Sequence, residues 1–309
     1  MEKLPIWIDC DPGVDDAAAL LLAHGLEALE IVGISTVSGN AHVDKTTKNA
    51  LKLCDLVCAS YPVYRGAEKP LFREYHDGAE FHGADGLGGA PLPEPAGDAE
   101  KLPAWDGLYA AAQRYAGKLE LVTLGPLTNI AIALGKHPDL KDKLHRIVMM
   151  GGSATRGNRT PSAEYNIYAD PEAAQAVFRS GVSIIMCGLE VTEQAQLLPE
   201  EIDRVAEKDT PVTRFFHAAV QDILKKDMER GRKGWCVHDA CPIAYLAHPE
   251  LFAGKEAGVF VETQAELTLG KTVTDLFSDK KFGSKNAVVV LEVDRAAFAA
   301  LLTETVGRI

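Results

Sequence analysis

The chain has 309 residues, of which 47% are hydrophobic and 25% are charged, and this composition is typical of a globular protein with a large core. Its formal net charge of -12 at pH 7 argues against binding of nucleic acid through a basic surface. It contains no apolar run near the roughly 20 residues of a membrane span and no signal-peptide pattern at its start, so we expect no membrane partner.

The N-terminal part alternates between short apolar runs, which predict buried strands, and patterns with helical spacing. Strands are predicted at residues 6–8, 30–36 and 62–66, and helices over 17–23 and 43–59 between them. Strand–helix alternation of this kind predicts a parallel sheet with right-handed crossovers. In such an open sheet, ligands bind at the carboxyl ends of the strands.

A long connection over residues 67–103 interrupts the alternation and is rich in Gly, Pro, Glu and Asp. Connections of this length are usually functional or disordered. Within it, residues 81–89 read FHGADGLGG, and a His and an Asp among glycines indicate a flap over a binding site. The alternative is a solvent-exposed loop in which His82 has no role.

After this connection the alternation resumes and then gives way to helices. Strands are predicted at residues 119–124, 146–150, 183–187, 259–269 and 286–293, and helices over 105–116, 127–134, 171–179, 199–208, 210–230 and 240–247, with a last helix from residue 295. We expect one domain over residues 1–309, with 67–103 as a flap-like loop and 258–309 as a small C-terminal β extension. The predicted fold is α/β, with an open, mainly parallel, Rossmann-like sheet flanked by helices.

Four carboxylates lie within the eight residues of segment 9–16, DCDPGVDD, where the first predicted strand ends and a helix begins. Carboxylates this dense repel one another, and a helix N-terminus offsets only about 0.3–1 kcal/mol per charge. A divalent cation neutralises them more effectively, and ligands that are all oxygen suit Ca2+ or Mg2+. The alternative is that Asp15 and Asp16 only cap the helix, which leaves Asp9 and Asp11 unexplained.

Polar clusters follow other predicted strands at the same expected edge of the sheet. They comprise Asn40, Gly125, the pair Gly151-Gly152 with the loop that follows, and the pair His238-Asp239. Their convergence with the acidic segment predicts one functional site at the carboxyl ends of the strands.

The sequence resembles the inosine-uridine nucleoside hydrolase family in five motifs, which occur in the family's order between residue 6 and about residue 245. They are DCDPGVDD at 9–16, LGPLTN at 124–129, MGG at 150–152, EYN at 164–166 with DPE at 170–172, and HD at 238–239. The resemblance implies a tightly bound Ca2+ and hydrolysis of the N-glycosidic bond of ribonucleosides to free base and ribose.

The resemblance also implies roles for individual residues. Metal ligands would be the side chains of Asp11, Asp16 and Asp239 with the backbone carbonyl of Leu124, where some members have Thr. Asp11 would also take the proton of the attacking water. Substrate contacts would come from Asp15, Asn166 and Asp239 at the 2'- and 3'-hydroxyls, from Asn158 and Glu164 at the 5'-hydroxyl, and from Asn40 and Met150 along the ribose. Without the resemblance, Asn158, Glu164 and Asn166 read as ordinary loop residues.

The residue types suit this chemistry. A metal and a neighbouring carboxylate activate water near neutral pH, and acceptor-rich walls stabilise the positive charge that develops on the sugar. For the leaving base, our hypothesis is that His238 acts as general acid or polariser, helped by His82 on the flap. His238 could instead be a helix-start histidine that is satisfied by hydrogen bonds. Trp235 or Met228, beside the glycine-rich segment 231–234, would lie near the base.

Two other functions fit parts of the sequence. One is a Mg2+-dependent phosphohydrolase with an N-terminal Asp nucleophile, but no phosphate-binding Lys or Arg is evident after the strands. The other is a ribose or nucleoside binding protein without turnover. Base preference stays open, and the two histidines favour pyrimidine or broad acceptance.

The setting of the protein is inferred from composition and from the resemblance. By resemblance we expect a homo-oligomer, a dimer or tetramer, that acts in nucleoside salvage. The six cysteines include no Cys-x-x-Cys pair and are too few for a disulfide scaffold. This favours a reducing, cytoplasmic location.

Overall fold

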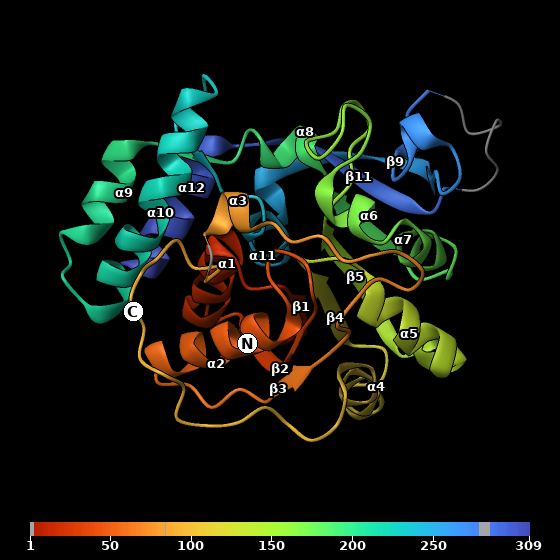
Figure 1. The fold of residues 1–309 in the computed structure, drawn as a ribbon, viewed down its shortest axis with the longest axis horizontal. Coiled ribbons are helices and arrows are strands. Elements are labelled where there is room, and N and C mark those ends of the chain that lie inside the picture. The colour runs from red at the N-terminus through yellow and green to blue at the C-terminus, as the bar shows by residue number, and fades with distance from the viewer. Residues whose placement is uncertain (1–2, 84, 278–284) are drawn as a thin grey trace.

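The computed structural model describes residues 3–83, 85–277 and 285–309, which are built around a nine-stranded sheet (Figure 1). The strand order is β10-β9-β11-β6-β5-β4-β1-β2-β3. The strands are β1 (Leu4–Cys10), β2 (Leu29–Thr36), β3 (Val63–Arg65), β4 (Leu119–Thr123), β5 (Leu144–Met150), β6 (Ile184–Cys187), β9 (Phe252–Val261), β10 (Thr272–Asp275) and β11 (Ala287–Val293), while β7 (Gln196–Leu197) and β8 (Trp235–Cys236) pair separately. Every neighbouring pair from β3 to β11 is parallel, whereas β9 runs antiparallel to β11 and β10. The predicted open, mainly parallel sheet is confirmed.

Helices connect the strands and cover both faces of the sheet. They are α1 (Val14–Gly25), α2 (Val43–Leu56), α3 (Ala79–His82), α4 (Ala104–Arg114), α5 (Thr128–Lys136), α6 (Tyr165–Ala169), α7 (Pro171–Phe178), α8 (Leu189–Thr192), α9 (Pro199–Ala206), α10 (Pro211–Glu229), α11 (Ala240–Ala247) and α12 (Arg295–Val306). Figure 1 shows α4, α5 and α7 on one side of the sheet and α1, α10 and α12 on the other. None of the helices in the described part of the chain has the length and apolar character needed to cross a membrane.

Strand β1 shows how the sequence builds two cores. Ile6 and Ile8 belong to the core under α1, whereas Trp7 between them belongs to the opposite core with Leu108 and Leu121. Successive side chains of a strand point to opposite faces, so a strand covered on both sides needs a continuous apolar run. Each fully buried side chain of this size contributes about 1.5–3 kcal/mol. The strand ends therefore form a firm platform for the loops that follow them.

The C-terminal β extension is part of the main sheet, and one predicted boundary in it is wrong. A strand was expected over residues 259–269, but β9 begins seven residues earlier and ends at Val261. The chain turns after that point because the N–H of Gly270 bonds to the carbonyl of Glu262 at 2.8 Å. Gly270 has a φ of 74°, which a residue with a side chain rarely adopts. β10 then returns as a short edge strand.

The long connection between β3 and α4 is tied to the body of the protein at several points. The N–H of Leu71 donates to Asp170 at 2.9 Å, and Arg73 pairs with Glu172. Further along, Gly88 packs directly on the backbone of Ala219 in α10, where a Cβ would overlap a carbonyl oxygen. The connection therefore runs over the carboxyl ends of the strands and carries α3 to that edge of the sheet.

Candidate functional site

The acidic segment forms the loop between β1 and the first turn of α1. Asp16 is the third residue of α1, and its carboxylate accepts the N–H groups of Asp11 at 3.1 Å and Gly13 at 2.8 Å. Asp16 therefore does cap the helix. Asp15 beside it instead lines a cavity, so capping does not account for the whole segment.

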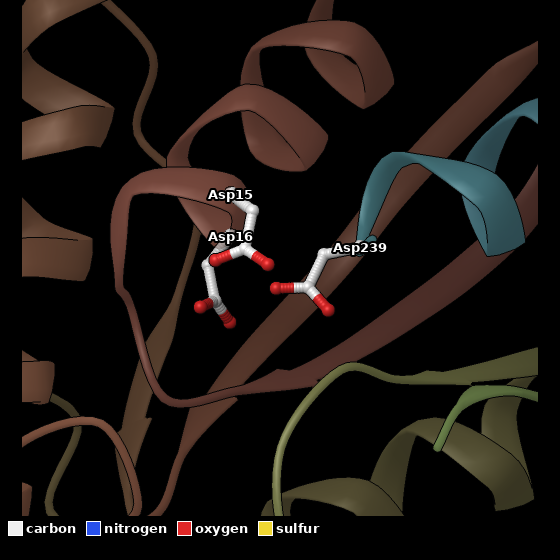
Figure 2. A group of neighbouring side chains, drawn as sticks. All are labelled: Asp15, Asp16 and Asp239. Carbon is white, nitrogen blue, oxygen red and sulfur yellow. The ribbon is translucent and has the colours of Figure 1, made fainter. Parts of the chain in front are cut away.

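Three carboxylates lie close together at this point: Asp15 and Asp16 come from the first turn of α1, and Asp239 comes from the start of α11, far along the chain (Figure 2). Asp15, Asp16 and Asp239 are all buried, and each offers an oxygen within 4.8 Å of the others. Burial raises the pKa of Asp15 and of Asp16 to about 6, and the charge of Asp15 adds to the rise for Asp16. Burial, followed by these two charges, raises the pKa of Asp239 well above its usual range. A bound cation would favour the charged forms again, so the cluster can hold a metal ion.

Asp11 lies next to this cluster, directly after β1. Its Oδ2 accepts the N–H of Asn40 at 2.6 Å, whereas its buried Oδ1, like Oδ1 of Asp15, has no hydrogen-bond partner among the described residues. A Cβ on Gly125 would lie 2.5 Å from Oδ1 of Asp11, and one on Gly39 would overlap Oδ2, so glycine is required on both sides. Buried oxygens without partners, in a donor set made only of oxygens, fit a hard divalent cation.

The structure brings the implied metal ligands together with one difference. The group of three mutually close carboxylates contains Asp15, which the resemblance assigned to the substrate, and not Asp11. Asn40 connects the two sets, because its Nδ2 donates to the carbonyl of Asp11 at 3.2 Å and to Oδ2 of Asp16 at 3.1 Å. Four acidic side chains thus surround one region.

A cavity of about 400 Å³ opens beside the carboxylates. The residues with an expected role that line it are Asp15, Asn40, His82, Leu124, Met150, Asn158, Glu164, Asn166, His238 and Asp239. Asp11 and Asp16 lie behind this wall, and their carboxylates accept hydrogen bonds from Asn40. The fold therefore brings the residues to which the resemblance assigns metal or ribose contacts, together with the two histidines, into one region.

Two residues of the polar loop after β5 are fixed by α6. Glu164 caps this helix, and its carboxylate accepts the N–H groups of Asn166 and Gly152, both at 2.9 Å. Burial raises the pKa of Glu164, and these backbone donors oppose the rise. Nδ2 of Asn166 donates to the carbonyl of Leu124 at 2.7 Å. The side chains of Glu164 and Asn166 are buried, so these two are not ordinary loop residues. Asn158, in contrast, is exposed at the rim of the cavity.

The two histidines face the cavity from different elements. Nδ1 of His82 in α3 accepts the N–H of Val14 at 3.2 Å, which leaves the proton of the neutral ring on Nε2. Nδ1 of His238 lies 2.8 Å from the hydroxyl of Thr192. Burial lowers the pKa of His82 to about 4 and that of His238 to about 3. Both rings are therefore neutral at pH 7.

A network of ion pairs at the other end of the cavity has no counterpart in the sequence-based predictions. Arg232 pairs with Asp227 at 2.6 Å and with Glu193 at 2.9 Å, and Glu193 also pairs with Arg156 at 2.6 Å. All four residues line the cavity. They come from α10, the loop before β8, the residue after α8 and the loop after β5. No local motif relates them, so only the tertiary structure could reveal them.

The expected position of Trp235 near the base is wrong. This side chain is fully buried in the core, with its ring centroid 6.0 Å from that of Phe216, because β8 turns it away from the cavity. Met228 is 48% exposed and is not part of the cavity wall. The apolar lining at this end comes instead from Phe81 in α3 and Ile223 in α10.

Comparison with known proteins gives consistent matches over nearly the whole chain. The family model described as inosine-uridine preferring nucleoside hydrolase matches residues 6–300. A protein named pyrimidine-specific ribonucleoside hydrolase RihA from Shewanella woodyi is 41% identical over 308 residues, covering 97% of each chain. A protein of the same name from Photobacterium profundum is 43% identical over 306 residues, again covering 97% of each.

Solved structures also match the fold along its full length. A plant nucleoside hydrolase, PpNRh1, superposes with a TM-score of 0.94 at 28% sequence identity and covers 100% of both chains. A purine-preferring ribonucleoside hydrolase from Gardnerella vaginalis has a TM-score of 0.93 at 29% identity and covers 98% of each chain.

Proposed function

The chain belongs to the inosine-uridine preferring nucleoside hydrolase family and is a ribonucleoside hydrolase, and we propose that it uses Ca2+ to hydrolyse nucleosides with a pyrimidine or broad base preference. The observation that carries this proposal is the cluster of buried carboxylates beside a cavity of nucleoside size. An acceptor-rich pocket suits a substrate that becomes positively charged during cleavage of a ribosyl bond.

Ca2+ would be held by Asp11, Asp16, Asp239 and the carbonyl of Leu124, with Asp15 close by. Ca2+ takes six to eight oxygen ligands in flexible geometry, which suits this crowded set better than the octahedral demand of Mg2+. The carbonyl of Leu124 already accepts the amide of Asn166, but a carbonyl oxygen has a second lone pair. When bound, the ion lowers the pKa of water and neutralises the carboxylates.

Asp11 is the proposed base. Its Oδ2 is fixed by the N–H of Asn40, which leaves Oδ1 to take the proton of the attacking water. Without the ion, burial and the charge of Asp16 raise the pKa of Asp11 well above its usual range. The bound cation would favour the charged form, so the carboxylate would be ready to accept the proton. The carboxylates of Asp15 and Asp239 would accept hydrogen bonds from the 2'- and 3'-hydroxyls, and the side-chain amide of Asn166 would donate one to them.

The remaining ribose contacts would come from the loop after β5 and from the wall. Asn158 and Glu164 would bind the 5'-hydroxyl, and Asn40 and Met150 would line the sugar. Because the buried side chains of Asp15, Asn166 and Asp239 would lack a partner at the 2'-position, a 2'-deoxynucleoside should be a poor substrate.

At the base end, the neutral imidazoles of His82 and His238 favour the role of polariser over that of general acid. His82 would donate a hydrogen bond from Nε2 to the leaving base, and His238 would do so from its free nitrogen. Such donors stabilise the negative charge that the base acquires as the bond breaks. The pyrimidine preference is supported by the names of relatives that are 41–44% identical.

The wider setting is proposed on less direct grounds. We take residues 1–309 as one catalytic unit, with 67–103 as its flap and 258–309 as an extension, that acts as a homo-oligomer in nucleoside salvage. All six cysteines are free thiols, which supports a cytoplasmic location.

The experiment that tests the function is reducing-sugar release from uridine, cytidine, inosine, adenosine and guanosine, before and after prolonged chelation. We expect release from uridine and cytidine at least, its loss on chelation, and recovery with Ca2+. Phosphate release from nucleotides without base release would favour the phosphohydrolase alternative. Tight nucleoside binding without sugar release would favour the binding-protein alternative.

A further inference from the structure

A second cavity of about 340 Å³ lies beside the catalytic one. The two share Arg159 and Tyr165 in their walls. Gly39, which also lines the second cavity, packs against the carboxylate of Asp11. The second cavity is therefore separated from the acidic cluster by little more than one backbone segment, and none of the proposed catalytic contacts uses it.

Aromatic side chains dominate the wall of this cavity. They are Phe72, Tyr75, His76, Tyr165 and Tyr168. The hydroxyl of Tyr75 donates to the carbonyl of Gly39 at 3.3 Å, and that of Tyr165 donates to the carbonyl of His76 at 3.2 Å. Because both hydroxyls are engaged with backbone, these tyrosines offer mainly apolar ring surface to a ligand.

Phe72 is the least covered of these rings, with 81% of its surface exposed. Its neighbour Arg73 is held by Glu172 at 2.9 Å and by the carbonyl of Thr263 at 3.1 Å, so the chain around Phe72 is anchored. A large apolar ring that is exposed at the rim of a cavity on an anchored segment is positioned to cover a flat ligand.

The charges around the cavity are balanced. Arg73 is paired with Glu172. Arg159, whose guanidinium lies 6.0 Å from the ring centre of Tyr165, and Glu74, which carries the opposite charge, both line the cavity. A site for phosphate or another anion would need an excess of positive charge. Aromatic walls without net charge instead suit an uncharged planar ring, because every heteroaromatic base has a face that can stack.

We propose that the second cavity binds an uncharged, planar heteroaromatic ring, namely a free nucleobase. The choice of a nucleobase rests on the proposed function, since cleavage releases one beside this cavity, whereas the ring-binding character rests on the walls alone. Tyr165 also connects this wall to the ribose end of the catalytic cavity, because its N–H donates to Oδ1 of Asn158 at 2.9 Å.

Equilibrium dialysis of the full-length, Ca2+-loaded protein with labelled uracil tests this inference. Wild type should bind one more equivalent of uracil than Phe72→Ala, because loss of one stacking partner weakens binding about tenfold or more. Phe72→Tyr keeps a ring and should keep that equivalent. Leu102→Ala removes another exposed apolar side chain, 52% exposed and outside this wall, and should also keep it.

Several results would overturn the inference. These are equal uracil binding by wild type and Phe72→Ala, no uracil binding by wild type, or displacement of the Phe72-dependent equivalent by inorganic phosphate alone. Uridine hydrolysis by the wild-type sample separately tests the proposed function. A sample that binds uracil through Phe72 but hydrolyses no nucleoside would refute the function and leave the ring site standing.

Discussion

The metal end and the base end of the catalytic cavity are built in different ways. Most of the metal end consists of short segments that follow strands of the parallel sheet, with Asp239 added from the start of α11. Its carboxylates are buried, and that of Asp11 packs against Gly39 and Gly125. The base end is assembled from α3 in the long connection, from α10 and from the loop before β8. There, ion pairs such as Arg232–Asp227 join segments that share no sheet pairing with the metal site.

This difference separates the groups that catalyse cleavage from the groups that contact the nucleobase. Changes at the metal end disturb a crowded set of charges and the strand ends that support it. Changes at the base end affect helices and loops, which tolerate substitution better. We therefore expect the metal end to determine whether ribose is released and the base end to determine from which nucleoside.

The largest expected effect is at the metal end, with Asp11→Asn. Loss of the general base should lower kcat for uridine roughly 10²–10⁴-fold. The metal-free variant should be at least as stable as wild type, because the raised pKa of Asp11 means that its charge is unfavourable in the folded state. Turnover and thermal unfolding measure the two effects. Asp203→Asn, which changes a largely exposed carboxylate on α9, is the matched control, and wild-type turnover in Asp11→Asn would exclude the role.

A smaller effect is expected from the histidines at the base end. His82→Ala and His238→Ala should each lower kcat roughly 10–100-fold, below or at the lower end of the range for general acid–base catalysis, because neutral rings only polarise the base. The loss should differ between uridine and inosine. His217→Ala, on the outer part of α10, is the control. Unchanged rates on both nucleosides would remove the histidines from the mechanism.

The same contrast explains what could be predicted from sequence. The acidic segment, Asn40 and Asp239 lie directly after strands or at the start of a helix, where local pattern and sheet geometry together fix their position. The fold class followed from the alternation of apolar runs for the same reason. These features depend on a few neighbouring residues.

His82 and His238 were expected at the base end, but its ion pairs and apolar lining could not be predicted, because those contacts are long-range. Arg232 meets Glu193, and Phe81 meets Arg230 at 4.8 Å, only because α10 and the long connection dock on each other. Trp235 illustrates the opposite error. Its position beside the glycine-rich segment 231–234 suggested the cavity, but the short pairing of β8 with β7 directs it into the core.

A more selective effect should follow from Arg232→Met. We expect kcat/KM to change about tenfold, by different factors for pyrimidine and purine nucleosides, since one hydrogen bond to a charged group contributes about 1.5–3 kcal/mol. Asp227, which is 3% exposed, would lose its main partner, so the variant should also unfold at a lower temperature. Arg232→Lys separates charge from shape, and Arg214→Met controls for loss of a surface ion pair. Equal changes for every nucleoside would contradict a role in base selection.

The smallest expected effect is a pH-dependent change in stability that arises from the carboxylates of the metal end. In the folded, metal-free protein the pKa of Asp15 and of Asp16 is about 6, above the ordinary value of 3.8. Their contribution to stability is therefore fully present below about pH 4 and is lost as the pH rises through 6. Ca2+ has to displace these protons, so it binds more weakly at pH 5 than at pH 7.5.

The increase in melting temperature on adding Ca2+ at a hundredfold excess over its Kd at pH 7.5 should accordingly be about 5 °C at that pH, and smaller at pH 5 with the same concentration of Ca2+. Mg2+ at the same concentration should give a smaller increase, because the site offers many oxygens but no regular octahedron. Thermal unfolding after chelation, with each ion added back at both pH values, measures this. An increase that is the same at pH 5 and pH 7.5 would mean that the ion binds away from the buried carboxylates, and they would then not form the metal site.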